Sequence, residues 1–272
     1  LKYSLRSIMM FAPWVNRIFI YMNNPKKKPS WFNDKYKDKI TIVDHTETKL
    51  AQFLPNTNSN AIETTITSIP DLSEHFIYFN DDVFLGKPVA WTDFFTLFGN
   101  PYISKYFEQS MHNDPIKKRT NIKLPNFAMA YRKAGWLHIP LPRLKSECIL
   151  FEETYNKYIK WIRNTKKRKG VGCDVCIKYN LKCPCQQVHS LINAFMYNRG
   201  KAAIMNYDNK ETYIGTSDYT NTKHLLNLFS NKPTKYLCIN DTNENAFYKQ
   251  HINNIILNFY EKFYYKKPFF EN

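Results

Sequence analysis

The sequence predicts an α/β protein in which a mostly parallel, Rossmann-like sheet is covered by helices. Short apolar segments of strand length alternate with amphipathic segments of helix length, which is typical of parallel sheets. Polar residues follow several of the predicted strands directly, at the edge where open parallel sheets bind ligands. Hydrophobic residues make up 43% and aromatic residues 16% of the 272 residues, so the chain can bury a core and is not disordered.

The expected elements follow from apolar spacing and from helix-ending residues. The first helix ends at Pro13, and its apolar stripe consists of Leu5, Ile8, Met9 and Ala12. A second helix is expected from Asn58 or Ser59, either of which can cap it, to Pro70. Strands are further expected at residues 17–22, 39–43, 75–79, 202–207 and 236–239, and helices at 151–163, 187–198 and 246–263.

The chain is strongly basic, with 39 Lys and Arg against 23 Asp and Glu and a formal net charge of +16. This charge indicates an anionic partner: nucleic acid, a phosphorylated small molecule or an acidic membrane surface. A compositional bias toward Lys, Asn, Tyr, Ile and Phe explains part of the excess of positive charge equally well. No recognised nucleic-acid-binding motif is present, so nucleic acid is not the expected partner. No apolar run approaches the roughly 18 residues of a membrane span, so membrane association is expected only through segments outside this chain.

The chain begins within a helical pattern, at Leu1, and we therefore expect it to be part of a larger protein. Residues 1–272 are predicted to form a single catalytic-type domain that lacks its N-terminal strand. Residues 165–187 form a Cys-rich insertion within this domain.

Four predicted strands end in polar side chains. They are followed by Asn23 and Asn24, by Asp44 and His45, by Asn80, Asp81 and Asp82, and by Asn240 and Asp241. Such residues often only start turns and cap helices. That interpretation is weakest for Asp81 and Asp82, because adjacent carboxylates repel each other unless a cation or a basic group offsets them. Carboxylate and amide oxygens suit Mg²⁺ or Mn²⁺ held together with phosphate oxygens.

Several segments resemble the conserved blocks of a known family. The segments are LKYSLRSI at 1–8, APWVNRIFI at 12–20, PSWF at 29–32, LPNTNSNAIE at 54–63, IPDLSEHFIYFNDDVFLGKP at 69–88, LHIP at 137–140, LCINDT at 237–242 and FYEKFYYKKPFFE at 259–271. They are similar to the Stealth family, which contains the catalytic α/β subunits of the lysosomal-enzyme N-acetylglucosamine-1-phosphotransferase and bacterial capsule-polymer hexose-phosphate transferases. The resemblance implies a glycosyltransferase-A-like fold and a hexose-1-phosphotransferase activity.

That activity would move a sugar 1-phosphate from a nucleotide sugar, linked through UDP, CMP or GDP, to a hydroxyl of a glycan acceptor. By the resemblance, His138 falls on a catalytic histidine and Arg168 on a phosphate-facing arginine. A neutral imidazole can take the acceptor proton near pH 7. The carboxylates that can hold the bridging Mg²⁺ or Mn²⁺ are Asp81, with a catalytic role, and Asp82 and Asp241. The expected substrate-binding residues are Arg6, Asn58, Ser59, Glu63, Asn80 and Asn240.

Simpler roles remain open for several of these residues. Taken alone, without the resemblance, His138 is better explained as a hydrogen-bonded loop histidine. Arg6 and Glu63 could form structural ion pairs, and Asn58 or Ser59 could simply cap a helix. Two other functions also stay as alternatives: a nucleic-acid-binding module, and a catalytically inactive sugar-binding module.

Four cysteines within the insertion form the pattern C-x₂-C-x₆-C-x-C, whereas Cys148 and Cys238 stand alone. The four are Cys173, Cys176, Cys183 and Cys185. Four thiolates at this spacing favour a tetrahedral structural Zn²⁺ site, with His189 as a spare ligand. Two disulfides are the alternative, which a secretory location would favour.

Overall fold

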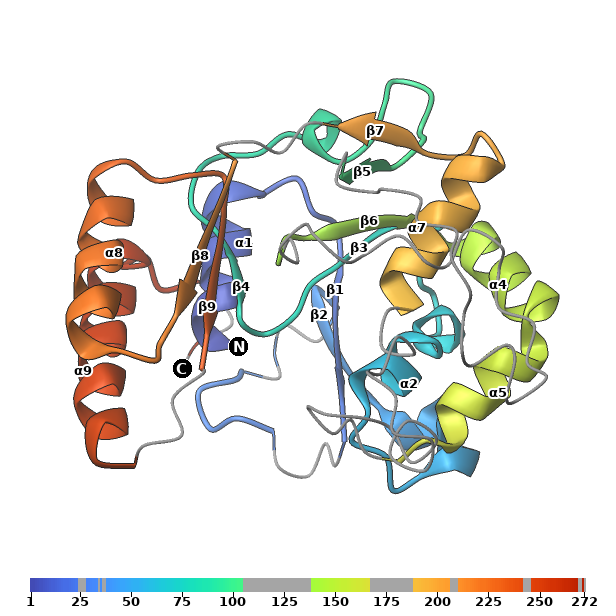
Figure 1. Ribbon diagram of the computed structural model, residues 1–272, viewed down its shortest axis with the longest axis horizontal. Coiled ribbons are helices and arrows are strands. Elements are labelled where there is room, and N and C mark those ends of the chain that lie inside the picture. The colour runs from blue at the N-terminus through green and yellow to red at the C-terminus, as the bar shows by residue number, and fades with distance from the viewer. Residues whose placement is uncertain are drawn as a thin grey trace, which may run out of the picture.

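The computed structural model describes residues 1–23, 28–33, 35, 38–104, 138–166, 188–205, 210–241, 246–268 and 271. Its helices are α1 (Lys2–Phe11), α2 (Ser59–Glu63), α4 (Lys145–Thr154), α5 (Asn156–Asn164), α7 (Val188–Asn198), α8 (Tyr219–Asn231) and α9 (Ala246–Phe263). Its strands are β1 (Ile18–Met22), β2 (Ile40–Asp44), β3 (His75–Tyr78), β4 (Val83–Leu85), β5 (Tyr102–Ser104), β6 (Leu141–Leu144), β7 (Ala203–Met205), β8 (Glu211–Gly215) and β9 (Tyr236–Asn240). The predicted α/β class is confirmed (Figure 1).

The strands differ from the predicted single sheet. Within the described residues they form four small sheets: β1-β2, β3-β6, β4-β9-β8 and β5-β7. The pairs β1-β2, β5-β7 and β8-β9 are parallel, whereas β3-β6 and β4-β9 are antiparallel. The antiparallel partners β4 and β6 were not predicted. β4 has only three residues, and β6 contains Pro142 and Arg143, which break the apolar pattern of a strand.

Helix α1 packs on β4, as its apolar stripe predicts, and two small polar residues of the helix also bond to this part of the chain. Ser4 donates its hydroxyl to the carbonyl of Val83 at 2.7 Å, and Ser7 accepts the backbone N–H of Leu85 at 3.0 Å. Both serines are buried. These bonds fix α1 against the strand that follows Asp82.

Two predicted helices differ from the structure: one is shorter and one is divided. Helix α2 ends at Glu63, because the hydroxyls of Thr64 and Thr65 bond back to the carbonyls of Ala61 and Ile62 at 2.7 Å, an alternative to continued helical bonding. The predicted helix at 151–163 is divided at Tyr155, whose backbone leaves the helical region between α4 and α5. Helix α9, in contrast, has the predicted bounds.

The sheet β4-β9-β8 has α8 and α9 on one side and α1 on the other (Figure 1). Gly86 follows β4 where α8 passes close to the chain. A Cβ atom at this position would lie 2.4 Å from both the Phe229 ring and the Thr234 carbonyl oxygen, so only glycine fits. A second core lies among α2, α4, α5 and α7. None of the helices described combines the length and the apolar character that a membrane crossing requires.

Candidate active site

The polar turn after β3 lies beside the end of β9. The Asn80 carbonyl accepts the Val83 N–H at 3.2 Å, which places Asp81 and Asp82 at the centre of a tight turn. The antiparallel pairing of β4 with β9 aligns Val83 with Cys238, and the Ile239 N–H donates to the Asp82 carbonyl at 3.1 Å. The antiparallel pairing of β4 with β9 thus brings the Asn80–Asp82 turn beside β9, whereas the sequence predicted these polar residues at the carboxyl edge of a parallel sheet.

Asp82 is the half-buried carboxylate of this turn, while Asp81 is exposed. The Cys238 thiol donates to Asp82 Oδ2 at 3.5 Å. Asp82 Oδ1 is buried and has no hydrogen-bond partner within the described part of the chain. Burial raises the pKa of Asp82 and Asp81 adds to the rise, whereas His138 opposes it. An unpaired carboxylate oxygen of this kind is expected where a cation or a substrate group binds.

The structure brings His138 to Asp82. One ring nitrogen of His138, one carboxylate oxygen of Asp82 and Sγ of Cys238 all lie within 4.8 Å of one another. The His138 ring also packs on Tyr213, with ring centroids 5.1 Å apart. The histidine therefore lies next to Asp82, beside the middle of β9 and the first residue of β8.

Strand β8 supplies two residues of this site that sequence reasoning missed. Glu211 accepts the His138 backbone N–H at 2.7 Å, and burial raises the pKa of Glu211 to about 7, against the effect of that N–H. Tyr213 pairs with Cys238 in the parallel register. Burial raises the pKa of Tyr213, and a hydrogen bond with Asn240 opposes the rise. Alternation along a strand places Glu211 and Tyr213 on one face, a signal that was readable once β8 was recognised.

Asn240 therefore contacts the site through Tyr213, whereas the neighbouring Asp241 is engaged elsewhere. Asp241 Oδ2 forms an ion pair with Lys249 of α9 at 2.9 Å, and the Thr216 hydroxyl donates to Oδ1 at 3.4 Å. The Asp241 side chain is largely exposed.

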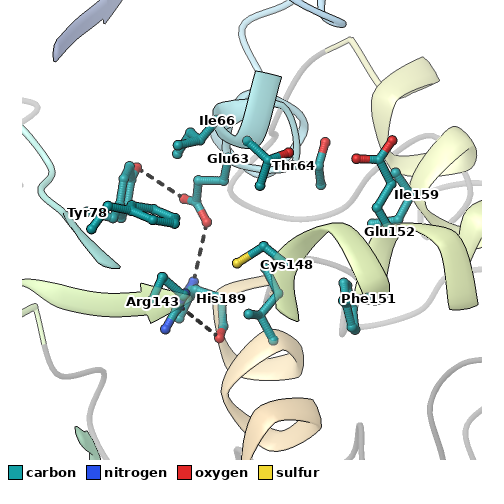
Figure 2. A pocket seen from close by; sticks show the side chains of 13 residues that line it. Glu63, Thr64, Ile66, Tyr78, Arg143, Cys148, Phe151, Glu152, Ile159 and His189 are labelled. Carbon is teal, nitrogen blue, oxygen red and sulfur yellow. Dashed lines mark hydrogen bonds and ion pairs between the residues drawn. The ribbon is translucent and has the colours of Figure 1, made fainter. Parts of the chain in front are cut away.

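A pocket adjoins the Asn80 turn between β3, α2, α4 and α7 (Figure 2). The Tyr78 hydroxyl lies 2.6 Å from Asn80 Oδ1 and 3.4 Å from Glu63 Oε1. The other Glu63 oxygen lies 3.8 Å from Nδ1 of His189. Burial raises the pKa of Tyr78 well above its usual range, and the charge of Glu63 adds to this. Two predicted binding residues, Glu63 and Asn80, are thus joined by Tyr78, which was not predicted.

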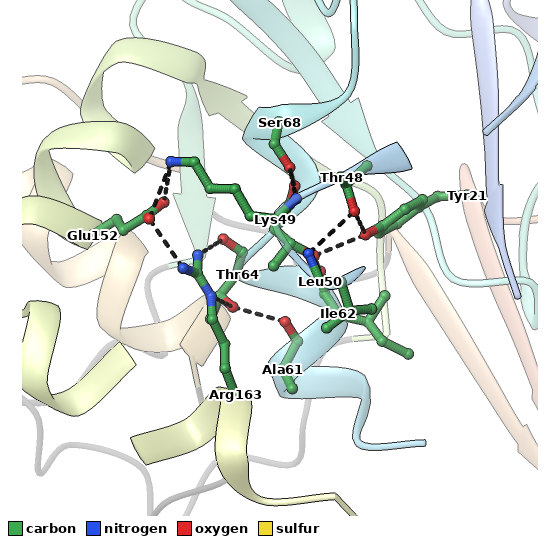
Figure 3. A network of polar contacts seen from close by, with 11 residues as sticks. Tyr21, Thr48, Lys49, Leu50, Ala61, Ile62, Thr64, Ser68, Glu152 and Arg163 are labelled. Atoms are coloured by element: carbon green, nitrogen blue, oxygen red, sulfur yellow. Dashed lines mark hydrogen bonds and ion pairs between the residues drawn. The ribbon is translucent and has the colours of Figure 1, made fainter. Parts of the chain in front are cut away.

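A polar network holds the helix that carries Glu63 (Figure 3). Arg163 of α5 donates to the hydroxyl of Thr64 at 2.9 Å, to its carbonyl at 2.7 Å and to Glu152 at 3.0 Å. Lys49 also binds Glu152, at 3.1 Å. Burial raises the pKa of Glu152, but the Arg163 guanidinium and the Lys49 ammonium together hold it below its usual value. These bonds hold Arg163 in place, and through them Arg163 positions α2.

Two other predicted binding residues have structural partners. Arg6 is 1% exposed and makes a bidentate pair with Glu271, at 2.5 and 2.7 Å, and it also donates to the Tyr264 carbonyl at 2.9 Å. Asn58 caps α2 by accepting the Asn60 N–H at 3.2 Å and donates to the Thr165 carbonyl at 3.0 Å. For both residues the structure shows the simpler role that the sequence left open. Ser59 is the first residue of α2.

The remaining predictions fall outside the described residues. Arg168 and the four cysteines Cys173, Cys176, Cys183 and Cys185 belong to this group. So does the Cys-rich insertion at 165–187, apart from its first two residues.

Comparisons with known proteins match this chain over most of its length. The profile of Stealth protein CR2, conserved region 2, matches residues 1–103. The chain is 31% identical over 271 residues to the capsular polysaccharide phosphotransferase cps12A of Actinobacillus pleuropneumoniae, covering 97% of this chain and 71% of that protein. It is 32% identical over 256 residues to the exopolysaccharide phosphotransferase CpsY of Mycobacterium leprae (strain TN), covering 89% of this chain and 43% of that protein. The receptor polysaccharide phosphotransferase WefC of Streptococcus oralis is 47% identical over 100 residues, which are 37% of this chain and 29% of that protein.

Proposed function

This chain belongs to the Stealth protein family, and from that premise we propose that it is the catalytic region of a polysaccharide phosphotransferase. It transfers a sugar 1-phosphate from a nucleotide sugar to a hydroxyl of an acceptor sugar, in the synthesis of capsule or exopolysaccharide. The observation that carries the proposal is the juxtaposition of His138 with the Asp82 carboxylate, whose ligand atoms lie within 4.8 Å. A proton acceptor and an anionic metal ligand are the two groups that this chemistry needs side by side.

In the proposed reaction, the acceptor hydroxyl oxygen attacks the phosphorus atom that carries the donor sugar. A new P–O bond forms to the acceptor, and the bond from this phosphorus to the oxygen that bridges to the nucleotide's own phosphate breaks. The nucleoside monophosphate leaves, and the hydroxyl proton passes to a ring nitrogen of His138. Glu211 positions His138 by accepting its backbone N–H, and Tyr213 packs against the ring.

The donor set fits the Mg²⁺ or Mn²⁺ that the family implies. Asp81, Asp82 and Asn240 offer hard oxygen ligands, and Asp82 Oδ1 is a buried oxygen without a hydrogen-bond partner in the described residues. Asp241 would become a ligand only by leaving its ion pair with Lys249. The cation would supply charge neutralisation for the diphosphate. Glu63 and Asn80 are the residues proposed to bind donor hydroxyls, since the hydroxyl of Tyr78, which lines the pocket, contacts both side chains. Arg168 is proposed to bind phosphate oxygens.

The released nucleotide tests the proposal. Candidate nucleotide sugars are incubated with an acceptor glycan and Mg²⁺, and the products are separated by anion-exchange chromatography. Sugar-phosphate transfer yields the nucleoside monophosphate and puts phosphorus into the acceptor. Release of the nucleoside diphosphate, with no phosphorus in the acceptor, would instead identify ordinary glycosyl transfer.

A further inference from the structure

Asp82, His138 and Cys238 bring three different donor types together: a carboxylate oxygen, an imidazole nitrogen and a sulfur. Their ligand atoms lie within 4.8 Å of one another. The set differs from the oxygen ligands expected for Mg²⁺, because sulfur and nitrogen donors favour later and softer divalent metals. We propose that these three residues form a binding site for a Zn²⁺-class cation, at which the cation inhibits the enzyme.

The geometry fits such a cation after a small closure. Zn²⁺ binds sulfur at about 2.3 Å and nitrogen or oxygen at about 2.0–2.2 Å, which puts tetrahedral ligand atoms about 3.3–3.8 Å apart. The three atoms must therefore approach by about 1.5 Å at most, a change within the reach of side-chain rotation. Cys238 and Asp82 are already in contact, with the thiol 3.5 Å from Oδ2. Their backbones are held by the pairing of β4 with β9.

A second observation points to a ligand at the same place. Asp82 Oδ1 is buried and makes no hydrogen bond to any described residue. Bound metal would give this carboxylate a partner, and the Cys238 thiol would release its proton to solvent as its sulfur becomes a ligand. Asp82 and His138 are only half-buried, so the fourth position of a tetrahedral site can open to solvent.

A Zn²⁺-class cation at this site would inhibit the enzyme because it binds two groups that the reaction needs. The lone pair of His138 that would accept the substrate proton becomes a metal ligand, and the Asp82 oxygen becomes less available to Mg²⁺. The inhibitory part of this inference rests on the proposed function, whereas the binding part does not. The two parts can fail separately.

The binding test uses Zn²⁺ alone, in equilibrium dialysis against the full chain. Because the insertion cysteines can also bind zinc, the measured quantity is the difference between variants. Cys238→Ser is expected to bind one equivalent fewer than the parent chain. Cys148→Ser changes a second buried free cysteine of the described residues and should bind the same amount as the parent. Cys238→Ala and His138→Gln should each lose the same single equivalent, so that a folding defect in one variant cannot decide the result. Equal zinc binding by parent and Cys238→Ser overturns the site.

The inhibition test compares each variant with its own zinc-free rate at fixed Mg²⁺. The Zn²⁺ concentration that halves activity should rise at least about tenfold in Cys238→Ser and stay unchanged in Cys148→Ser. Loss of the bound equivalent without any change in inhibition would refute inhibition at this site while leaving the binding intact. A chain that binds zinc as described but transfers no sugar phosphate refutes the proposed function alone.

Discussion

The backbone N–H of His138 donates to the carboxylate of Glu211 at 2.7 Å, which ties the segment before β6 to the first residue of β8. The two residues are far apart in the sequence, and no motif connects them. The contact places the imidazole against Tyr213, next to Asp82. Glu211 therefore acts on the site through the position of His138.

Glu211→Gln and Glu211→Ala should separate a positioning role from a charge effect. Glutamine keeps an acceptor oxygen for the His138 N–H, so kcat should stay within about tenfold of the parent value. Alanine leaves that N–H unpaired and lets the ring shift, so kcat should fall about 100-fold with little change in KM for the nucleotide sugar. Steady-state kinetics measure both, with the exposed Glu153→Ala on α4 as control. Equal losses for glutamine and alanine would show that the charge matters and the hydrogen bond does not.

Asp82→Asn should abolish Mg²⁺-dependent transfer and leave the fold intact. The substitution removes a metal ligand but also a half-buried charge next to Asp81, so the melting temperature should stay the same or rise. Thermal unfolding and a rate assay at saturating Mg²⁺ check the two effects, with Glu153→Gln as the control. Retained activity in Asp82→Asn would remove this carboxylate from the site.

His138→Ala should lower turnover by roughly 10² to 10⁴-fold and change nucleotide-sugar affinity little, because a general base acts in the transition state. Arg168→Ala should weaken binding and turnover together, since a guanidinium also contacts phosphate in the ground state. Calorimetric binding and single-turnover rates distinguish the two variants. The exposed His224→Ala on α8 is the control and should match the parent. A His138→Ala variant that loses only affinity would contradict the role of base.

Arg6→Ala should destabilise the protein by about 3–5 kcal/mol, because it leaves the buried Glu271 carboxylate without its bidentate partner. Arg17→Ala is the matched control. Its pair with Asp71 is exposed, and the loss should be below about 1 kcal/mol. Urea unfolding of both variants measures the difference. Near-equal values would mean that the Arg6 pair is no stronger than a surface pair.

The buried His45 should lower the free energy of unfolding of the protein in acid. His45 is 4% exposed and packs its ring against Tyr21. Both ring nitrogens lack a partner among the described residues. Burial lowers the pKa of His45, and the charge of Asp44 opposes this effect. The unfolded chain, with a histidine pKa of about 6.5, then binds the proton more readily than the folded one. The contribution to stability is complete above about pH 6.5 and falls as the pH decreases, by at most about 1.4 kcal/mol per pH unit.

Urea unfolding between pH 8 and pH 5 measures this slope. His45→Phe, which keeps an aromatic ring against Tyr21 and cannot titrate, should flatten it. The substitution of the exposed His224, His224→Asn, should leave the slope unchanged. An unchanged slope in His45→Phe would assign the acid sensitivity to other groups.

The sequence by itself determined the family and many of the local elements, though not β4, β5, β6, β8 or α8. Apolar spacing located α1, β1, β2, β3, β9 and α9, because periodicity and residues such as Pro13 act over a few neighbouring positions. The sequence also marked Asp81 and Asp82, because adjacent carboxylates are a local signal. The resemblance of residues 137–140 to a block of the family marked His138. It could not find β4 and β6, whose short or proline-containing segments become strands only through their partners.

Only the tertiary structure decided which residues meet. The pairing of β4 with β9 placed Cys238 against Asp82, and the pairing of β8 with β9 brought Glu211 and Tyr213 to His138. The tertiary structure also determines that Arg6 pairs with Glu271 and that Arg163 positions α2. These contacts join segments far apart in the sequence. Their energies depend on burial and on partner geometry, which exist only in the folded chain.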